Sequence, residues 1–169
     1  MAAAPGMRLH GSCVLVGTRG VLLRGWAGSG KSTMVLDLLT HDTPERAVRL
    51  VADDAVDIVA AGGRLVACAP PPTFGLLEIR WVGLAPVAAE RRAVVGLVLD
   101  LVAEHDAERL PEPGQSWAEL AGIRLPRLAL PADRAGNALR LLTAVRALDA
   151  GQWPPACPAS GGSPSRIRT

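Results

Sequence analysis

The sequence predicts a strand-rich α/β domain with a mixed sheet, one helix behind a glycine-rich loop and a second, amphipathic helix near the C-terminus. Short aliphatic and β-branched runs recur along the chain, a glycine-rich stretch follows the second run, and two segments carry apolar residues at helical spacing. At 169 residues the chain can bury the core of one domain. We assign residues 1–150 to this domain and expect a disordered tail over residues 151–169, where Pro, Ala, Ser and Gly show no periodicity.

The expected elements follow from local patterns. Apolar runs predict strands over residues 12–17, 20–24, 48–52, 55–60, 64–68, 94–102 and 127–130. Apolar residues three and four positions apart predict helices over residues 31–40 and 137–148. Residues 110–122 combine Pro, Gly and polar side chains, so we expect a loop there with one helical turn at most.

Composition excludes several classes of protein. The formal net charge is +2, with acidic and basic residues interleaved, so we expect no nucleic-acid partner. No apolar run reaches the roughly 20 residues that span a bilayer, and the N-terminus lacks a signal-peptide pattern, which predicts a cytoplasmic protein without a membrane partner. Cys13, Cys68 and Cys157 form no C-x-x-C pair and are expected to be reduced thiols.

A glycine-rich loop between an expected strand and an expected helix matches the phosphate-loop pattern G-x-x-x-x-G-K-[ST]. Its residues are Gly25, Trp26, Ala27, Gly28, Ser29, Gly30, Lys31, Ser32 and Thr33. Glycines let backbone N–H groups point at phosphate oxygens, Lys31 bridges the β- and γ-phosphates, and the Ser32 hydroxyl is a ligand for Mg²⁺. Lys31 is also the only lysine of the chain. The loop therefore predicts nucleotide binding, with an incidental glycine-rich turn as the alternative.

Asp53 and Asp54 end the expected strand over residues 48–52. In a parallel sheet the carboxyl ends of strands face the nucleotide, where paired carboxylates hold Mg²⁺ through water and accept the proton of an attacking hydroxyl. The alternative is that one aspartate caps a turn. His10 and Glu78 carry weaker signals, since a lone histidine is usually structural or exposed and Glu78 with Arg80 is also explained as a surface charge pair.

Five segments in order resemble the catalytic domain of the HPr kinase/phosphorylase family, whose members phosphorylate a serine of HPr, a phosphocarrier of the phosphotransferase system. The segments are HGSCVLV (10–16), GWAGSGKST (25–33), RLVADDAVDI (49–58), ACAPPPTFGLLEIRWVGL (67–84) and LALPADRAGNALRLL (128–142). The resemblance covers roughly residues 8–148. It implies a P-loop kinase domain of the HPr kinase type that uses ATP and Mg²⁺.

The resemblance also implies roles for single residues. Asp54 would be the base that activates the target serine, and the acid in the reverse, phosphorylase reaction. His10 would lie in the active site close to Asp54, and Lys31 would bind the transferred phosphate. Arg109 in AERLPE is similar to the family's downstream catalytic arginine. The Mg²⁺ ligands that the resemblance implies are Ser32 and Glu78.

The chain also departs from the family pattern. We expect a short form without the family's separate N-terminal domain, and the hexameric assembly of the family makes a homo-oligomer the corresponding expectation. The loop after LEIR is shorter, and residues 131–136 replace a segment that the family links to dephosphorylation. Trp81 stands where the family has glycine and Trp26 where it usually has aspartate. The alternatives are a kinase for another protein or small-molecule hydroxyl, and a nucleotide-binding regulator without turnover.

Overall fold

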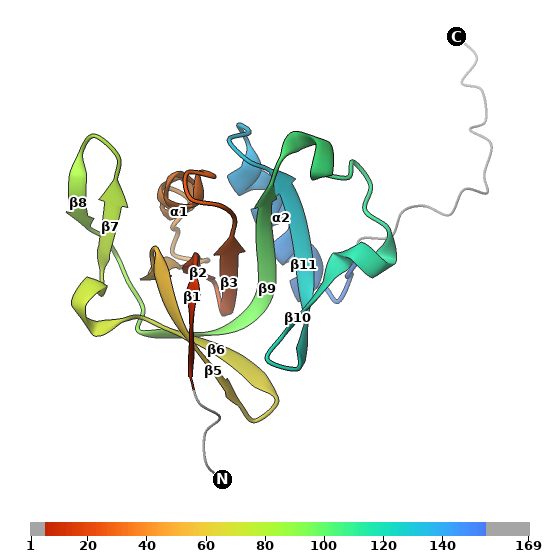
Figure 1. The fold of residues 1–169 in the computed structure, drawn as a ribbon, viewed down its shortest axis with the longest axis horizontal. Helices are drawn as coiled ribbons and strands as arrows, with labels where there is room; N and C mark the ends of the chain where they lie inside the picture. The colour runs from red at the N-terminus through yellow and green to blue at the C-terminus, as the bar shows by residue number, and fades with distance from the viewer. Residues whose placement is uncertain (1–5, 155–169) are drawn as a thin grey trace, which may run out of the picture.

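The computed structural model describes residues 6–154 and contains two sheets and two α-helices (Figure 1). The strands are β1 (Met7–His10), β2 (Ser12–Val16), β3 (Arg19–Arg24), β4 (Val48–Ala52), β5 (Ala55–Ala61), β6 (Arg64–Cys68), β7 (Leu76–Ile79), β8 (Gly83–Pro86), β9 (Arg92–Val102), β10 (Trp117–Leu120) and β11 (Ile123–Pro131). The helices are α1 (Lys31–Leu39) and α2 (Asn137–Asp149), with short 3₁₀ turns at Pro71–Thr73, Glu104–Asp106 and Pro113–Ser116.

The long strand β9 joins the parts of a nine-stranded sheet with the order β1-β5-β6-β9-β3-β2-β4, and β11 and β10 extend it from β9. The start of β9 pairs antiparallel with β6, whereas Leu99 pairs in parallel with Leu23 of β3 on one side and Leu128 of β11 on the other. Both β3 and β4 run antiparallel to β2. Therefore β4, β3, β9 and β11 all point the same way, and their carboxyl ends share one edge of the sheet.

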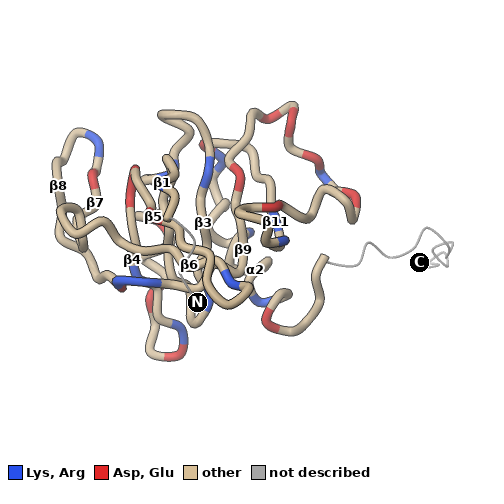
Figure 2. Tube along the Cα trace, turned by 60° about the horizontal axis from the view of Figure 1, so that its bottom comes forward, with Lys and Arg blue, Asp and Glu red and all other residues tan. Residues whose placement is uncertain are grey.

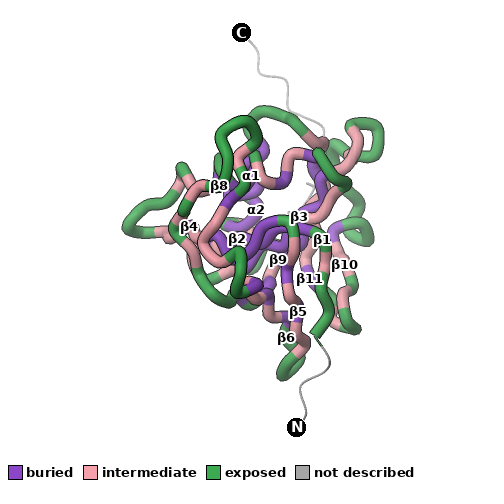
Figure 3. The backbone as a smooth tube through the Cα atoms, turned by 60° about the vertical axis from the view of Figure 1, so that its left-hand side comes forward, coloured by how far each residue is buried: buried purple, intermediate pink, exposed green. Residues whose placement is uncertain are grey.

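Two apolar layers cover the two faces of these central strands. Because side chains alternate along a strand, Leu23 and Leu99 face the helices while Leu22 and Val98 face the β1-β5-β6 part of the sheet. The helices contribute apolar stripes made of Met34, Val35, Leu38, Ala138, Leu141, Leu142 and Val145. Figure 3 shows the buried residues concentrated along the central strands and the inner faces of the helices. This packing holds the strand ends, and the loops that follow them, in fixed positions.

The mixed, strand-rich architecture confirms the predicted fold class, and every predicted helix and strand is present with ends shifted by a few residues. The predicted loop with at most one helical turn over residues 110–122 was right for the turn, Pro113–Ser116, and wrong for the rest, because β10 lies there and pairs with an extended β11. Its turn, Ala121 and Gly122, has two positive φ angles of 50° and 73°, as a two-residue hairpin requires. Strands β1, β7 and β8 were not predicted.

The remaining expectations concern thiols, charge and the ends of the chain. Cys13 and Cys68 are free thiols, and burial raises the pKa of Cys13 to about 12, which keeps that thiol protonated. Acidic and basic residues are interspersed in Figure 2. Within residues 6–154, neither helix combines the length and apolar character needed to cross a membrane. Cys157 and most of the predicted tail, residues 155–169, lie outside the described residues.

Candidate active site

The glycine-rich loop connects β3 to α1 at the shared carboxyl edge of the parallel strands. Gly28 and Gly30 have φ angles of 84° and 87°, a region that side chains other than glycine rarely adopt. Gly30 is also the N-cap of α1, and a Cβ at this position would lie 2.5 Å from Oδ1 of Asp133. The glycines therefore set both the curl of the loop and its close approach to the connection between β11 and α2.

Lys31 is held at the start of the loop. Its Nζ donates hydrogen bonds of 3.0 Å to the carbonyl oxygens of Gly25 and Trp26, and the residue is only 7% exposed. Within residues 6–154, no carboxylate lies within ion-pair distance of this ammonium group. Its positive charge is therefore balanced only by carbonyl dipoles, so it is available to an anion bound over the N-terminus of α1.

Asp53 links the loop helix to two strands. Ser12 Oγ donates to its Oδ1 at 2.6 Å, and Ser32 Oγ donates to its Oδ2 at 3.0 Å. The carboxylate is buried, and in the described part of the chain it contacts hydroxyl groups but no cationic side chain. Hydroxyl and carboxylate oxygens are the donors that Mg²⁺ prefers, and that ion keeps several waters in sites of this kind. Ser32 and Asp53 thus fit an Mg²⁺ ion.

Asp54 lies in a tight turn at the rim of the site. Its φ is 64°, and the Ala55 N–H bonds the Asp53 carbonyl at 2.8 Å across it. Nδ1 of His10 lies 3.2 Å from Oδ1 of Asp54, and the side chain of Asp54 is 85% exposed. Non-glycine residues with positive φ are uncommon and concentrate at functional sites. The turn therefore presents a carboxylate, oriented by a histidine, to whatever enters the site.

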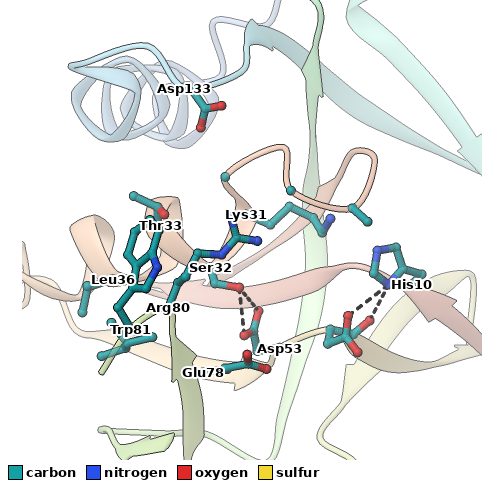
Figure 4. Close-up of a pocket in the computed structure, with 15 residues that line it drawn as sticks. His10, Lys31, Ser32, Thr33, Leu36, Asp53, Glu78, Arg80, Trp81 and Asp133 are labelled. Atoms are coloured by element: carbon teal, nitrogen blue, oxygen red, sulfur yellow. Dashed lines mark hydrogen bonds and ion pairs between the residues drawn. The ribbon is translucent and has the colours of Figure 1, made fainter. Parts of the chain in front are cut away.

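These residues surround one pocket of about 410 Å³ (Figure 4). The pocket is lined by His10, Ala27, Gly28, Gly30, Lys31, Ser32, Thr33, Leu36, Asp53, Asp54, Glu78, Ile79, Arg80, Trp81 and Asp133. Glu78 extends into it from β7, which belongs to the separate two-stranded sheet. Among the described residues, no three His, Cys, Asp or Glu side chains approach closely enough to form a metal cage. Metal binding here would rely on the serine hydroxyl, on Asp53 and on phosphate oxygens.

The structure brings most of the candidate residues together, but not all of them. His10, Lys31, Ser32, Thr33, Asp53, Asp54 and Glu78 line the pocket, together with Ala27, Gly28 and Gly30 of the loop. Gly25, Trp26 and Ser29 do not line it, although the backbone carbonyls of Gly25 and Trp26 hold Lys31. Arg109 is exposed in the connection between β9 and β10 and is not part of this pocket.

Three residues of the site were not singled out from the sequence. Ser12, a polar residue inside an otherwise apolar strand, carried a local signal because a buried hydroxyl needs a partner. Arg80 follows Glu78 and lines the pocket. Asp133 had no local signal, since its approach to Gly30 depends on how the segment before α2 folds back over the loop.

Comparison with known proteins places the chain in a family. The family model described as HPr Serine kinase C-terminal domain matches residues 2–150. A protein of Clostridium perfringens named HPr kinase/phosphorylase is 45% identical over 86 residues, which is 51% of this chain and 26% of the relative. A Clostridium tetani protein of the same name is 45% identical over 84 residues, 50% of this chain and 26% of that protein. The chain thus spans about a quarter of the length of these relatives.

A solved structure supports the fold. The Hpr(Ser) kinase/phosphatase from Coxiella burnetii superposes with a TM-score of 0.73 at 24% sequence identity. The superposition covers 86% of this chain and 92% of that chain. The two chains therefore share one fold over nearly their whole compared length.

Proposed function

This chain belongs to the family of HPr serine kinase C-terminal domains, and from that premise we propose that it is an ATP-dependent, Mg²⁺-requiring kinase that phosphorylates a serine of HPr. The observation that carries the proposal is the joint position of Lys31, Ser32 and Asp53 beside the exposed Asp54. A regulator that only bound nucleotide would need Lys31, Ser32 and Asp53 to hold phosphate and metal. It would have no use for an exposed base such as Asp54.

In the proposed reaction the serine hydroxyl enters beside Asp54, which accepts its proton. The serine oxygen forms a bond to the γ-phosphorus while the bond from that phosphorus to the β-γ bridging oxygen breaks, and ADP leaves with that oxygen. His10 keeps the Asp54 carboxylate in place through its Nδ1. The reverse transfer uses the same groups, with the protonated Asp54 acting as acid.

Electrostatic stabilisation comes from groups around the phosphates. The ammonium of Lys31 would leave the carbonyls of Gly25 and Trp26 for phosphate oxygens, and the N–H groups at the start of α1 supply further positive potential. Ser32 and Asp53 would hold Mg²⁺, which supplies charge neutralisation at the phosphates. A role for Glu78 as a further ligand and a role for Arg109 in catalysis remain predictions, as do the cytoplasmic location and the homo-oligomer.

The test is phosphoryl transfer from γ-labelled ATP to HPr in the presence of Mg²⁺. The wild type is expected to label HPr on serine, and Asp54→Asn is expected to lower the rate by about 10²- to 10⁴-fold, the range for loss of a general base. Asp57→Asn is the matched control, because this aspartate lies on β5, the strand that follows Asp54, pairs with Arg8 and does not line the pocket. It should label HPr at the wild-type rate.

Two results would decide against the proposal. Absence of label on HPr, with nucleotide still bound, would point to a different acceptor hydroxyl. Equal labelling by wild type and Asp54→Asn would remove that aspartate from the role of base.

A further inference from the structure

Trp81 has an unusual position at the rim of the pocket. It occupies the turn between β7 and β8, is 95% exposed and has a φ of 64°. A bulky residue in the left-handed region is a backbone outlier, and an indole that is almost wholly exposed to water gains nothing from burial. Glycine would adopt the positive φ of this turn without strain and would expose no apolar side chain. The tryptophan therefore has no structural reason within the described chain to be there, which points to a ligand.

The indole faces the nucleotide site rather than open solvent alone. Trp81 lines the same pocket as the glycine-rich loop, and Figure 4 shows its ring beside Thr33 and Leu36 on the flank of α1. In the same view His10 lies on the opposite side of Ser32. The guanidinium of Arg80 lies 5.8 Å from the centroid of the Trp81 ring, and Arg80 also lines the pocket.

The two ends of the pocket carry different residues, which fixes how a nucleotide would lie in it. His10 and Asp54 mark the end at which the acceptor hydroxyl enters, and Lys31 with Ser32 mark the phosphates. A nucleotide whose terminal phosphate points toward the acceptor end has its nucleoside at the other end, where Trp81 lies. Leu36 and Trp81 line that end, with Thr33 and Arg80 beside them.

We propose that the Trp81 indole, with Leu36 beside it, is a stacking platform for the base of the nucleotide bound by the loop. This inference rests on the proposed nucleotide-dependent function. Base–aromatic stacking tolerates different bases because every base has a π-face, and an Arg beside the ring adds cation–π attraction. Since stacking does not depend on the edge groups that distinguish the bases, the platform should hold ATP and GTP with similar affinity.

Trp81 differs from the other exposed apolar side chains of the hairpin because it borders the phosphate site. Val82 and Leu84 are 76% and 69% exposed on the same hairpin, yet neither lines the pocket. A protein docking on this hairpin would use the whole apolar tip, whereas a base needs only the one ring that borders the phosphate site. Leu84→Ala therefore serves as a matched control on the same hairpin.

Calorimetric titration with Mg²⁺ tests the platform, using ATP and inorganic tripolyphosphate, which lacks a base, as probes. Trp81→Gly should weaken ATP binding about tenfold and leave tripolyphosphate binding unchanged, since stacking is lost and the phosphate site is intact. Trp81→Phe should retain most of the ATP affinity, and Leu84→Ala all of it. Because glycine readily adopts the φ of 64°, Trp81→Gly is expected to fold.

Several outcomes would overturn the platform. Unchanged ATP binding by Trp81→Gly is the first, and equal weakening of ATP and tripolyphosphate, which would mean a distorted phosphate site, is the second. Normal ATP affinity with slower labelling of HPr would instead assign Trp81 to acceptor docking. If the wild type binds ATP through Trp81 but labels no HPr, the kinase proposal fails and the platform stands; if the wild type binds neither probe, both fail.

Discussion

Two buried aspartates near the same edge of the sheet have opposite surroundings. Asp53 follows β4 and Asp100 lies near the end of β9, and they are 9% and 8% exposed. Asp100 accepts hydrogen bonds of 2.7 and 2.8 Å from Arg24 and one of 2.6 Å from Arg127. Asp53 accepts hydrogen bonds only from hydroxyl groups in the described part of the chain.

The difference separates a structural carboxylate from one suited to binding. The two guanidinium groups more than balance the charge of Asp100 and tie β3, β9 and β11 together just before the glycine-rich loop begins at Gly25. The charge of Asp53 has hydrogen bonds but no cation. A buried negative charge without a cation is unfavourable, and a bound metal ion would relieve it. Charge balance, rather than burial, distinguishes the two sites.

Among the effects that follow from comparing Asp53 with Asp100, the largest is the expected loss of activity in Asp53→Asn. The amide keeps the size of the side chain and part of its hydrogen bonding but removes the charge, so phosphoryl transfer to HPr should fall by about 10²- to 10³-fold. Mg²⁺ with ATP should raise the melting temperature of the wild type more than that of this variant, because ligand binding stabilises only the form that binds it. An equal rise in both proteins would contradict a metal-binding role for Asp53.

The next effect is on stability, and it should appear at Asp100. Asp100→Ala leaves two partly buried guanidinium groups without their partner, and we expect a loss of about 3 kcal/mol in the free energy of unfolding measured in urea. Asp149→Ala is the control, because its ion pair with Arg19 is more exposed and should contribute at most about 1 kcal/mol. Equal losses of unfolding free energy in Asp100→Ala and Asp149→Ala would contradict the distinction between the buried and the exposed ion pair.

The smallest expected effect is the pH dependence of the stabilisation that the Asp100 ion pairs contribute. Burial raises the pKa of Asp100, but the hydrogen bonds from Arg24 and Arg127 outweigh it and hold the pKa below the ordinary value of 3.8. A lowered pKa in the folded state means that the stabilisation is complete above the ordinary value and is lost as the pH falls through the lower, folded value.

The difference in unfolding free energy between wild type and Asp100→Asn measures this directly. It should be constant above about pH 5 and shrink below about pH 4, by about 1.4 kcal/mol for each unit by which the pKa is lowered. Asp42 and Asp57 also have lowered pKa values, but both are present in the two proteins, so their contributions cancel. A difference that stays constant down to pH 2 would show that Asp100 is not held ionised by the two arginines.

Local sequence determined much of this protein. The pattern that ends in Gly30-Lys31-Ser32 predicts its own strand–loop–helix context, because glycine backbone freedom and helix N-terminal N–H groups are properties of neighbouring residues. The amphipathic spacing over residues 137–148 likewise predicts α2. The β10 hairpin was missed because its turn contains Ala121, whose φ of 50° depends on the pairing around it.

Only the tertiary structure decided which side chains meet. The bond from Ser12 to Asp53 joins residues 41 positions apart, and the bond from Arg24 to Asp100 joins residues 76 positions apart. Both exist because the sheet places the start of β2 beside the end of β4, which is antiparallel to it, and the end of β3 beside its parallel partner β9. No local pattern encodes this arrangement. The approach of Trp81 to the flank of α1 likewise depends on where the β7–β8 hairpin rests. Periodicity is a property of neighbours along the chain, whereas charge balance and the shape of a pocket are properties of neighbours in space.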